Sequence, residues 1–409
     1  MPIHKHDPIP EDQMNRISPR HTICETIREA YHQLDPEKDA DARLKLRIAT
    51  SMAKSMTNKL TEYKRNWTQG FWDDNERFPK DSTRKPIDVL FLCWDDNSNT
   101  MARFWQCARY LGLNSVMFKG RPHPFGYPNQ APIHPSLANI PIAPAPITVM
   151  SPGIESLINS AHLIHLGAST YPMCAVDWRK KNVVIQHGGS VYRQHPDSCN
   201  NLFNQIAQHS IIQCPDLLGL GAKNEHWIYY PVDTVKLKPD FRRKGEKLVI
   251  GHFPSNAEVK GTDRINQVGI RADDNGLAEY RWSTNKLPWP AHLKRMAACD
   301  IIIEGCNAKQ GDKTYGEFGN QALEAAALGC IVVTHCVHKE QYEKEFGELG
   351  PLIANNEQEL EQTLRMLLSL PDDEIEYLKR KCRAWAEQKH SIPVTANRLW
   401  DEVYKHYFG

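Results

Sequence analysis

The sequence predicts an α/β protein with two parallel-sheet domains, and two features of the chain lead to this prediction. Short, continuous apolar runs alternate with segments of helical spacing, as expected when strands are buried on both faces of a parallel sheet. The alternation begins at Ile87, is interrupted by the charged segment 236–247, and resumes at Leu248. The chain therefore reads as two successive α/β domains joined by a hinge, facing a ligand cleft between the carboxyl ends of their strands.

Composition limits the class of protein. A chain of 409 residues is long enough for two domains and an extension, and its formal charge of +1 excludes a strongly basic polynucleotide binder. No apolar run approaches the roughly 20 residues of a membrane span, and the polar start lacks the pattern of a signal peptide. The 11 cysteines include no Cys-x-x-Cys pair, which predicts reduced thiols, a cytoplasmic location and no metal site.

Residues 1–80 are predicted to form a polar helical extension, with helices over 22–34 and about 39–67. Seven basic residues and one acidic residue lie between Arg43 and Arg65. One interpretation is a solvated charged face with aromatics packed on the main body. The other is a stripe that follows nucleic-acid phosphates beside stacking aromatics. The aromatics concerned are Trp67, Phe71 and Trp72.

Residues 81–238 are predicted to form the first α/β domain. It opens after the linker 75–86 and contains a Pro-rich segment, 120–150, that has the composition of a long loop lining a site. Its predicted strands are 87–94, 115–119, 161–167, 183–186, 210–213 and 227–232, and its predicted helices are 100–111, 152–159 and one in the 170s.

Residues 239–390 are predicted to form the second α/β domain, and 391–409 a helix that packs back on the first domain. The predicted strands are one that begins at Leu248 and two that cover 301–303 and 331–334. The predicted helices are 261–271, 290–298, 317–328, 356–369, 372–389 and 393–407.

The segment 316–333, GEFGNQALEAAALGCIVV, is the most informative stretch for function. Gly316 and Gly319 let the backbone approach a ligand closely, and the following helix offers its free N–H groups to an anionic phosphate. Glu324 lies on the same helix, where a carboxylate accepts hydrogen bonds from ribose hydroxyls. Together these residues predict a site for a nucleotide sugar.

Four blocks give the chain a resemblance to a known family. They are VVIQHGGSVYR (183–193), YYPVDTVKLKP (229–239), IGHFPSNAEVKGTD (250–263) and YGEFGNQALEAAALGCIVV (315–333). Their order and spacing resemble the retaining GT-B glycosyltransferases of the family-4-like group, the glycosyl transferases group 1 type. The resemblance covers about 86–407 and implies the GT-B architecture of two Rossmann-like domains.

The resemblance assigns roles on the donor side. Lys260 matches the lysine that binds the donor diphosphate, and Glu324 matches the glutamate that holds the donor ribose. The backbone around the start of the helix would take the phosphate or the sugar. The full set of expected donor-binding residues is Lys260, His252, Glu317, Phe318, Gly319, Asn320 and Glu324.

The resemblance also suggests residues for catalysis and for the acceptor. His187 matches a histidine that faces the cleft from the end of a strand, and Arg193 follows six residues later. Asp95 and Asp96 lie in the first loop, where a carboxylate could bind an acceptor hydroxyl. His165 matches the first of two strand-end histidines.

Three departures from the family pattern bear on mechanism. Gly316 stands where the family has a glutamate, Gly167 replaces the second histidine, and the arginine that usually accompanies Lys260 is missing from its loop. Enzymes of this type depend on positioning and charge stabilisation during a front-face attack rather than on a fixed nucleophile.

The predicted function is therefore the transfer of a sugar from a nucleotide diphosphate to an acceptor hydroxyl, with retention of configuration. No metal or other cofactor is required. The acceptor is a saccharide, a lipid-linked molecule or a protein or, as the alternative, hydroxymethylated pyrimidine in viral DNA. A non-catalytic protein that binds nucleotide sugars is the alternative from another class, and an epimerase-like enzyme that uses Asp95, Asp96 and Glu317 is a third.

Overall fold

The computed structural model describes residues 86–93, 96, 99–119, 147–150, 154–167, 170–173, 176–307, 309–310, 313–314 and 316–408. All of them belong to the compact unit Asp74–Gly409. The predicted helical extension 1–80, with its basic and aromatic residues, lies outside these ranges. So does the Pro-rich segment as far as residue 146, and the expectations for both remain predictions.

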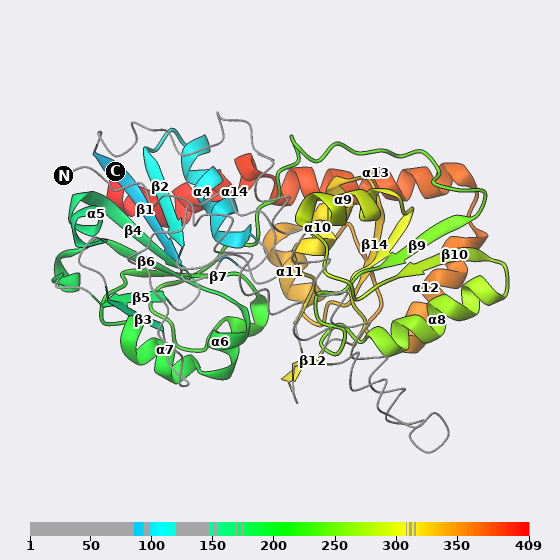
Figure 1. The fold of residues 1–409 in the computed structure, drawn as a ribbon, viewed down its shortest axis with the longest axis horizontal. Helices are drawn as coiled ribbons and strands as arrows, with labels where there is room; N and C mark the ends of the chain where they lie inside the picture. Colours follow the sequence, from blue (N-terminus) through cyan, green and yellow to red (C-terminus); the bar gives the residue numbers. More distant parts are fainter. Residues whose placement is uncertain are drawn as a thin grey trace, which may run out of the picture. The chain divides into compact units, whose positions relative to one another are not determined.

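The first α/β domain contains a six-stranded parallel sheet in the order β2-β1-β4-β6-β7-β8 (Figure 1). In its centre, Val89 pairs with Ser115 on one side and with Leu163 on the other. Apolar residues occupy both faces of the central strands, which confirms that the continuous apolar runs are buried strands. The strands are β1 (Ile87–Cys93), β2 (Ser115–Lys119), β4 (Ala161–Gly167), β6 (Val183–His187), β7 (His209–Ile212) and β8 (Glu225–Trp227).

The predicted helices 100–111 and 152–159 are present as α4 and α5, whereas α6 and α7 were not predicted and the helix expected in the 170s is absent from the described residues. The segment predicted as a helix in the 170s instead contains strand β5 (Thr170–Met173), which pairs in parallel with β3 (Ile147–Met150). Pro172 lacks a backbone N–H and disfavours a helix interior, while Thr170 and Tyr171 favour extended backbone. The helices are α4 (Thr100–Tyr110), α5 (Ile154–Ser160), α6 (Gly189–Gln194) and α7 (Pro196–Phe203), with short 3-10 turns η2 (Trp178–Lys180) and η3 (Pro215–Leu217).

The second α/β domain contains a five-stranded parallel sheet in the order β10-β9-β11-β14-β15 (Figure 1). The predicted strands at 248, 301 and 331 are its three central members, whereas the edge strands β10 and β15 and the helix α11 were not predicted. The strands are β9 (Leu248–His252), β10 (Ala278–Trp282), β11 (Ile301–Ile303), β14 (Ile331–Thr334) and β15 (Leu352–Ile353), with a separate hairpin of β12 (Lys309–Gln310) and β13 (Lys313–Thr314). The helices are α8 (Thr262–Asp274), α9 (Trp289–Ala297), α10 (Asn320–Ala327), α11 (Lys339–Phe346), α12 (Glu357–Ser369) and α13 (Asp372–His390).

The C-terminal segment returns to the first domain. It consists of α14 (Ile392–Leu399), the π-helical turn η4 (Trp400–Tyr404) and α15 (Lys405–Phe408), where the sequence predicted one continuous helix. α14 lies beside α4 (Figure 1), and Leu399 and Tyr404 share an apolar core with Phe91 of β1. No helix in the described ranges is long and apolar enough to cross a membrane.

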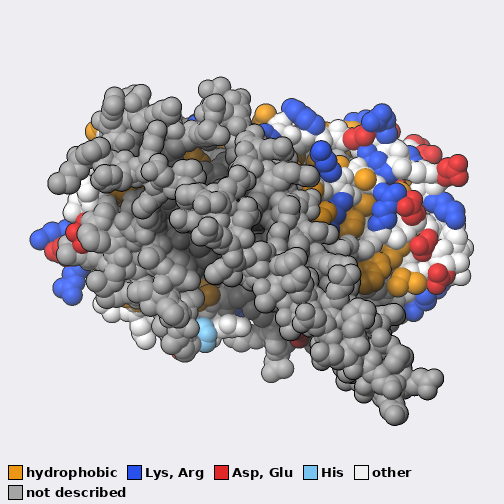
Figure 2. Space-filling view, in the orientation of Figure 1, with side chains coloured by type: hydrophobic (Ala, Val, Ile, Leu, Met, Phe, Trp, Pro, Cys, Tyr) orange, Lys and Arg blue, Asp and Glu red, His pale blue; other side chains and the backbone are white. Residues whose placement is uncertain are grey.

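A buried ion pair joins α13 to the second sheet. Lys379 and Asp300 are both fully buried, and the Lys379 ammonium lies 2.6 Å from the Asp300 carboxylate. Asp300 also accepts a hydrogen bond from the backbone N–H of Val249, at 2.9 Å. This interior pair contrasts with the surface, where Lys and Arg are interspersed with Asp and Glu over the second domain on the face shown in Figure 2.

Asp300→Asn is expected to destabilise the second domain by about 3–5 kcal/mol, because it leaves the Lys379 ammonium buried without a counter-charge. Urea unfolding followed by circular dichroism measures the loss. Glu361→Gln, which removes the exposed partner of Arg365, is the matched control and should cost no more than about 0.5 kcal/mol. Equal effects of the two substitutions would contradict the prediction.

Candidate functional site

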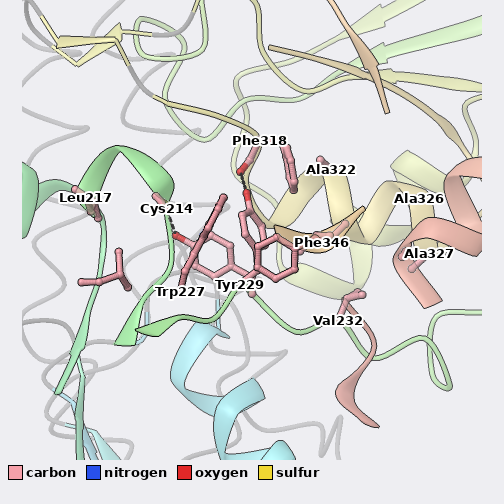
Figure 3. Close-up of a cluster of buried hydrophobic side chains, with 14 of the residues drawn as sticks. Cys214, Leu217, Trp227, Tyr229, Val232, Phe318, Ala322, Ala326, Ala327 and Phe346 are labelled. Atoms are coloured by element: carbon pink, nitrogen blue, oxygen red, sulfur yellow. Dashed lines mark hydrogen bonds between the residues drawn. The ribbon is translucent and has the colours of Figure 1, made fainter. Parts of the chain in front are cut away.

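The backbone loop before α10 is fixed by contacts from the first domain. The Tyr229 hydroxyl donates a hydrogen bond of 2.7 Å to the carbonyl oxygen of Phe318 (Figure 3). The two rings pack with centroids 4.8 Å apart, and Phe318 also packs edge-on against Trp385 at 5.2 Å. Helix α10 then begins at Asn320, with a run of buried alanines that allows it to lie close to its neighbours. The loop and the helix N-terminus therefore have a defined position.

Lys260 lies next to this helix N-terminus. The following residue, Gly261, has φ +69°, and a Cβ there would lie 2.0 Å from the carbonyl oxygen of Cys306, so the turn requires glycine. The Lys260 ammonium pairs with the Glu304 carboxylate. A Cβ on Gly319 would lie 3.7 Å from the Lys260 nitrogen. The structure thus brings together Lys260 and the glycine that precedes α10, as the nucleotide-sugar prediction requires.

Glu304 is a site residue that the sequence analysis missed. It directly follows β11, is buried, and accepts a hydrogen bond of 2.9 Å from the Thr334 hydroxyl. Burial acts to raise the pKa of Glu304, but the adjacent Lys260 ammonium outweighs burial and the net pKa is lowered. The carboxylate is therefore ionised and orients Lys260. The sequence feature that could have identified Glu304 is a single acidic residue directly after a buried apolar strand.

Glu324 is held by two residues that the sequence analysis also missed. Its Oε1 accepts hydrogen bonds from the Arg103 guanidinium and, at 2.8 Å, from the Trp289 indole N–H. Arg103 belongs to α4 of the first domain and also donates to the Asn320 side-chain oxygen at 2.5 Å. The Glu324 Oε2 accepts no hydrogen bond from the described residues. The sequence feature that could have identified Arg103 is its positive charge within a largely apolar helix.

Hydrogen bonds within the protein engage both ring nitrogens of His252. Its Nδ1–H donates to the Ile303 carbonyl at 2.8 Å, and its Nε2 accepts from the Thr262 hydroxyl at 2.9 Å. Burial lowers the pKa of His252 to about 4, so the ring is neutral near pH 7. Both ring nitrogens are occupied, and His252 supports the loop that carries Lys260 rather than offering a nitrogen to a ligand.

The two strand-end histidines of the first domain differ in their partners. His187 is fully buried and stacks on Tyr192 with centroids 4.0 Å apart, and neither ring nitrogen has a hydrogen bond within the described ranges. Burial lowers the pKa of His187 to about 3. His165 instead uses both nitrogens, toward the Tyr404 hydroxyl at 2.7 Å and the Gln186 side-chain oxygen at 3.2 Å. His165 is thus tied into the core.

Asp96 precedes helix α4 and binds its first turn. Its two carboxylate oxygens accept hydrogen bonds from the backbone N–H groups of Met101, at 2.6 Å, and Ala102, at 2.9 Å. These contacts satisfy two of the donors that every helix leaves open at its start. Burial raises the pKa of Asp96 to about 6. The other predicted acid of this loop, Asp95, lies outside the described residues.

Arg193 and Glu317 lie around the start of the 316–319 loop. Arg193 pairs with Asp216, its Nε lying 2.5 Å from Oδ2. Glu317 is buried, and neither of its oxygens has a hydrogen-bond partner within the described part of the chain. Burial, assisted by the charge of Asp216, raises the pKa of Glu317 well above its ordinary value. The environment of Glu317 therefore favours its protonated form.

Comparison with solved structures shows that the chain has the GT-B fold. A structure of Alr3699/HepE from Anabaena in complex with UDP-glucose matches with a TM-score of 0.52 and 14% identity, over 78% of this chain and 100% of that one. Sucrose-phosphate synthase from Thermosynechococcus elongatus matches with a TM-score of 0.52 and 11% identity, over 78% and 99%. No family model and no curated protein matches the sequence.

Glu317→Gln is expected to flatten the pH dependence of stability. The folded state keeps Glu317 protonated while the unfolded chain loses that proton near pH 4.5, so the wild-type protein loses stability as pH rises from there to the raised folded pKa. The difference between the two proteins should grow by up to about 1.4 kcal/mol per pH unit in that window. Urea unfolding at several pH values measures it. Parallel pH profiles would show that Glu317 is ionised in the folded protein.

Proposed function

We propose that this protein is a glycosyltransferase that takes a sugar from a nucleotide diphosphate and transfers it to an acceptor hydroxyl with retention of configuration. The observation that supports this best is the order of groups along the loop and α10. Lys260 lies at Gly319, where the helix begins, and Glu324 follows one helical turn after Asn320. A cation at a helix N-terminus suits a diphosphate, and a carboxylate about 6 Å further along the helix suits the attached ribose.

The diphosphate would meet two sources of positive charge. The open N–H groups of α10 carry the positive end of the helix dipole, and Lys260 adds a full charge that Glu304 orients. When the bond between the sugar and the diphosphate breaks, negative charge builds on the leaving phosphate. Groups fixed in advance around that charge stabilise the transition state more than the ground state. In this proposal they fill the role that a divalent cation has in other transferases.

The ribose would bind Glu324. Arg103 and Trp289 fix the carboxylate through Oε1, and Oε2 remains available to accept a hydrogen bond from a ribose hydroxyl. Because Arg103 comes from the first domain, the same ion pair also links the two domains at the nucleotide. UDP and UDP-glucose are suitable first probes, because structures with the same fold contain them.

A saccharide is the acceptor that we propose. The basic stripe that suggested a DNA acceptor lies outside the described residues. Asp96 is bound by backbone N–H groups in the first turn of α4, and His187 is buried and neutral. Acceptor activation would therefore depend on positioning and on the leaving phosphate rather than on either of these side chains. The nine described cysteines are all buried and none of them forms a disulfide, which supports the predicted cytoplasmic location.

Lys260→Gln is expected to weaken UDP binding by roughly 10- to 100-fold, as expected for a lost charge-assisted hydrogen bond to phosphate. Isothermal titration calorimetry with UDP measures the change. Lys247→Gln is the matched control, because Lys247 is an exposed lysine that precedes β9, at the opposite end of the strand from the site. UDP affinity that is unchanged in Lys260→Gln would refute the proposed diphosphate site.

The stereochemical part of the proposal has its own measurement. Proton NMR of the transferred sugar reports whether the anomeric configuration of the donor is kept. A product of inverted configuration would contradict retention while leaving the donor site in place.

A further inference from the structure

The side chain of Asp216 occupies the space beside Gly316. A Cβ added at Gly316 would lie 2.9 Å from both Cβ and Oδ1 of Asp216, and 3.1 Å from its Cγ. Cβ atoms in proteins do not approach other atoms so closely, so Asp216 and a side chain at residue 316 exclude one another. Asp216 comes from η3 of the first domain, whereas Gly316 begins the donor loop of the second.

Arg193 fixes the Asp216 carboxylate. The Arg193 Nε lies 2.5 Å from Oδ2, and the two side chains are 3% and 11% exposed. A charge-assisted hydrogen bond at so low an exposure holds the carboxylate in one orientation. The other oxygen, Oδ1, is buried and has no hydrogen bond within the described ranges. It is also the oxygen that approaches Gly316.

A second carboxyl group, that of Glu317, lies next to this carboxylate. Both of its oxygens are buried without a hydrogen-bond partner among the described residues, although buried polar atoms in proteins are nearly always paired. Glu317 is only 1% exposed, so Asp216 is the member of the pair that retains contact with the surface. A concentration of acceptor oxygens of this kind is suited to a ligand that carries several hydroxyl groups.

The position of Asp216 along the donor loop indicates which part of a nucleotide sugar it would meet. Gly316 and Gly319 are three residues apart, so their Cα atoms are separated by no more than about 11 Å. Lys260 and the start of α10 define the diphosphate end at Gly319, and Glu324 lies beyond it on the ribose side. Along the chain, Asp216 therefore meets the loop on the side of Gly319 that is away from Glu324, and in a nucleotide sugar the sugar is attached to the diphosphate on the side away from the ribose.

We propose that Asp216, held by Arg193, accepts hydrogen bonds from hydroxyls of the transferred sugar and so provides, from the first domain, the carboxylate that residue 316 lacks. This inference rests on the proposed function and names the part of the site that recognises the sugar. It predicts that the two domains share the donor, with the second binding the nucleotide and the first contacting the sugar.

The first experiment compares UDP with UDP-glucose in Asp216→Asn, which keeps the size of the side chain and removes its charge. UDP-glucose affinity should fall by roughly 10- to 100-fold, as for a lost hydrogen bond to a charged acceptor, while UDP affinity should stay within about twofold. Asp177→Asn, which breaks an exposed pair with Lys180 in the same domain, is the matched control and should change neither affinity. Calorimetry gives both constants, and urea unfolding shows that each variant is folded.

The second experiment moves the carboxylate. Gly316→Glu alone should impair UDP-glucose binding because its side chain meets Asp216, and Asp216→Gly alone should impair it because the carboxylate is lost. The double variant Asp216→Gly with Gly316→Glu has both the room and the carboxylate, so its UDP-glucose affinity should exceed that of either single variant by roughly tenfold or more. A purely structural role of Asp216 would restore stability in the double variant but not the preference for UDP-glucose.

The outcomes separate the inference from the proposed function. The role of Asp216 is overturned if Asp216→Asn binds UDP-glucose as tightly as the wild type does. It is also overturned if the variant loses the same affinity for UDP as for UDP-glucose. Either result leaves the proposed function intact. A wild-type protein that binds neither UDP nor UDP-glucose overturns the proposed function, and the inference falls with it.

Discussion

The hydrogen bond from the Tyr229 hydroxyl to the Phe318 carbonyl is the constraint on which the candidate site depends. Tyr229 belongs to the end of the first domain, whereas Phe318 precedes the helix whose N-terminus faces Lys260. The bond lies in a buried aromatic cluster where water cannot compete for the carbonyl, and an unpaired buried carbonyl would cost about 1–3 kcal/mol. The first domain therefore fixes the backbone with which the second would bind a diphosphate.

Three ion pairs of low exposure hold charged side chains of the site. Such pairs cost desolvation when they form, and their loss is severe when one partner is removed, so they favour a single geometry more than they add net stability. The pairs are Lys260 with Glu304, Glu324 with Arg103, and Arg193 with Asp216. The Arg103 pair crosses between the domains, which couples the position of the first domain to the carboxylate that we assign to the ribose. In the proposed function, binding of the donor and the arrangement of the two domains would therefore influence each other.

The sequence predicted those features that depend on neighbouring residues. Strands 115–119, 161–167, 301–303 and 331–334 match the structure at both ends, because a buried apolar run between turns is a local signal. The same local reasoning located the Lys260 turn and the loop before α10. It did not find Arg103, which is 221 residues from Glu324, because periodicity contains no information on which distant elements meet. Segment 170–173 was misjudged because its pairing with β3 is equally non-local.

Gly316 shows most directly how a local interpretation changes with tertiary structure. In the sequence, glycine stands where the resembled family has a glutamate, so the pattern lacks one carboxylate. In the structure, the space that a side chain at 316 would need is filled by Asp216, 100 positions earlier in the chain, and Arg193 orients that carboxylate toward it. Side chains at 216 and 316 would occupy the same space, so acidic residues at both positions would clash. With an acidic residue at neither position, Arg193 would be buried without the carboxylate of this pair. Whether residue 316 can carry a carboxylate therefore depends on residue 216. With an aspartate at 216, glycine is the residue that fits at 316.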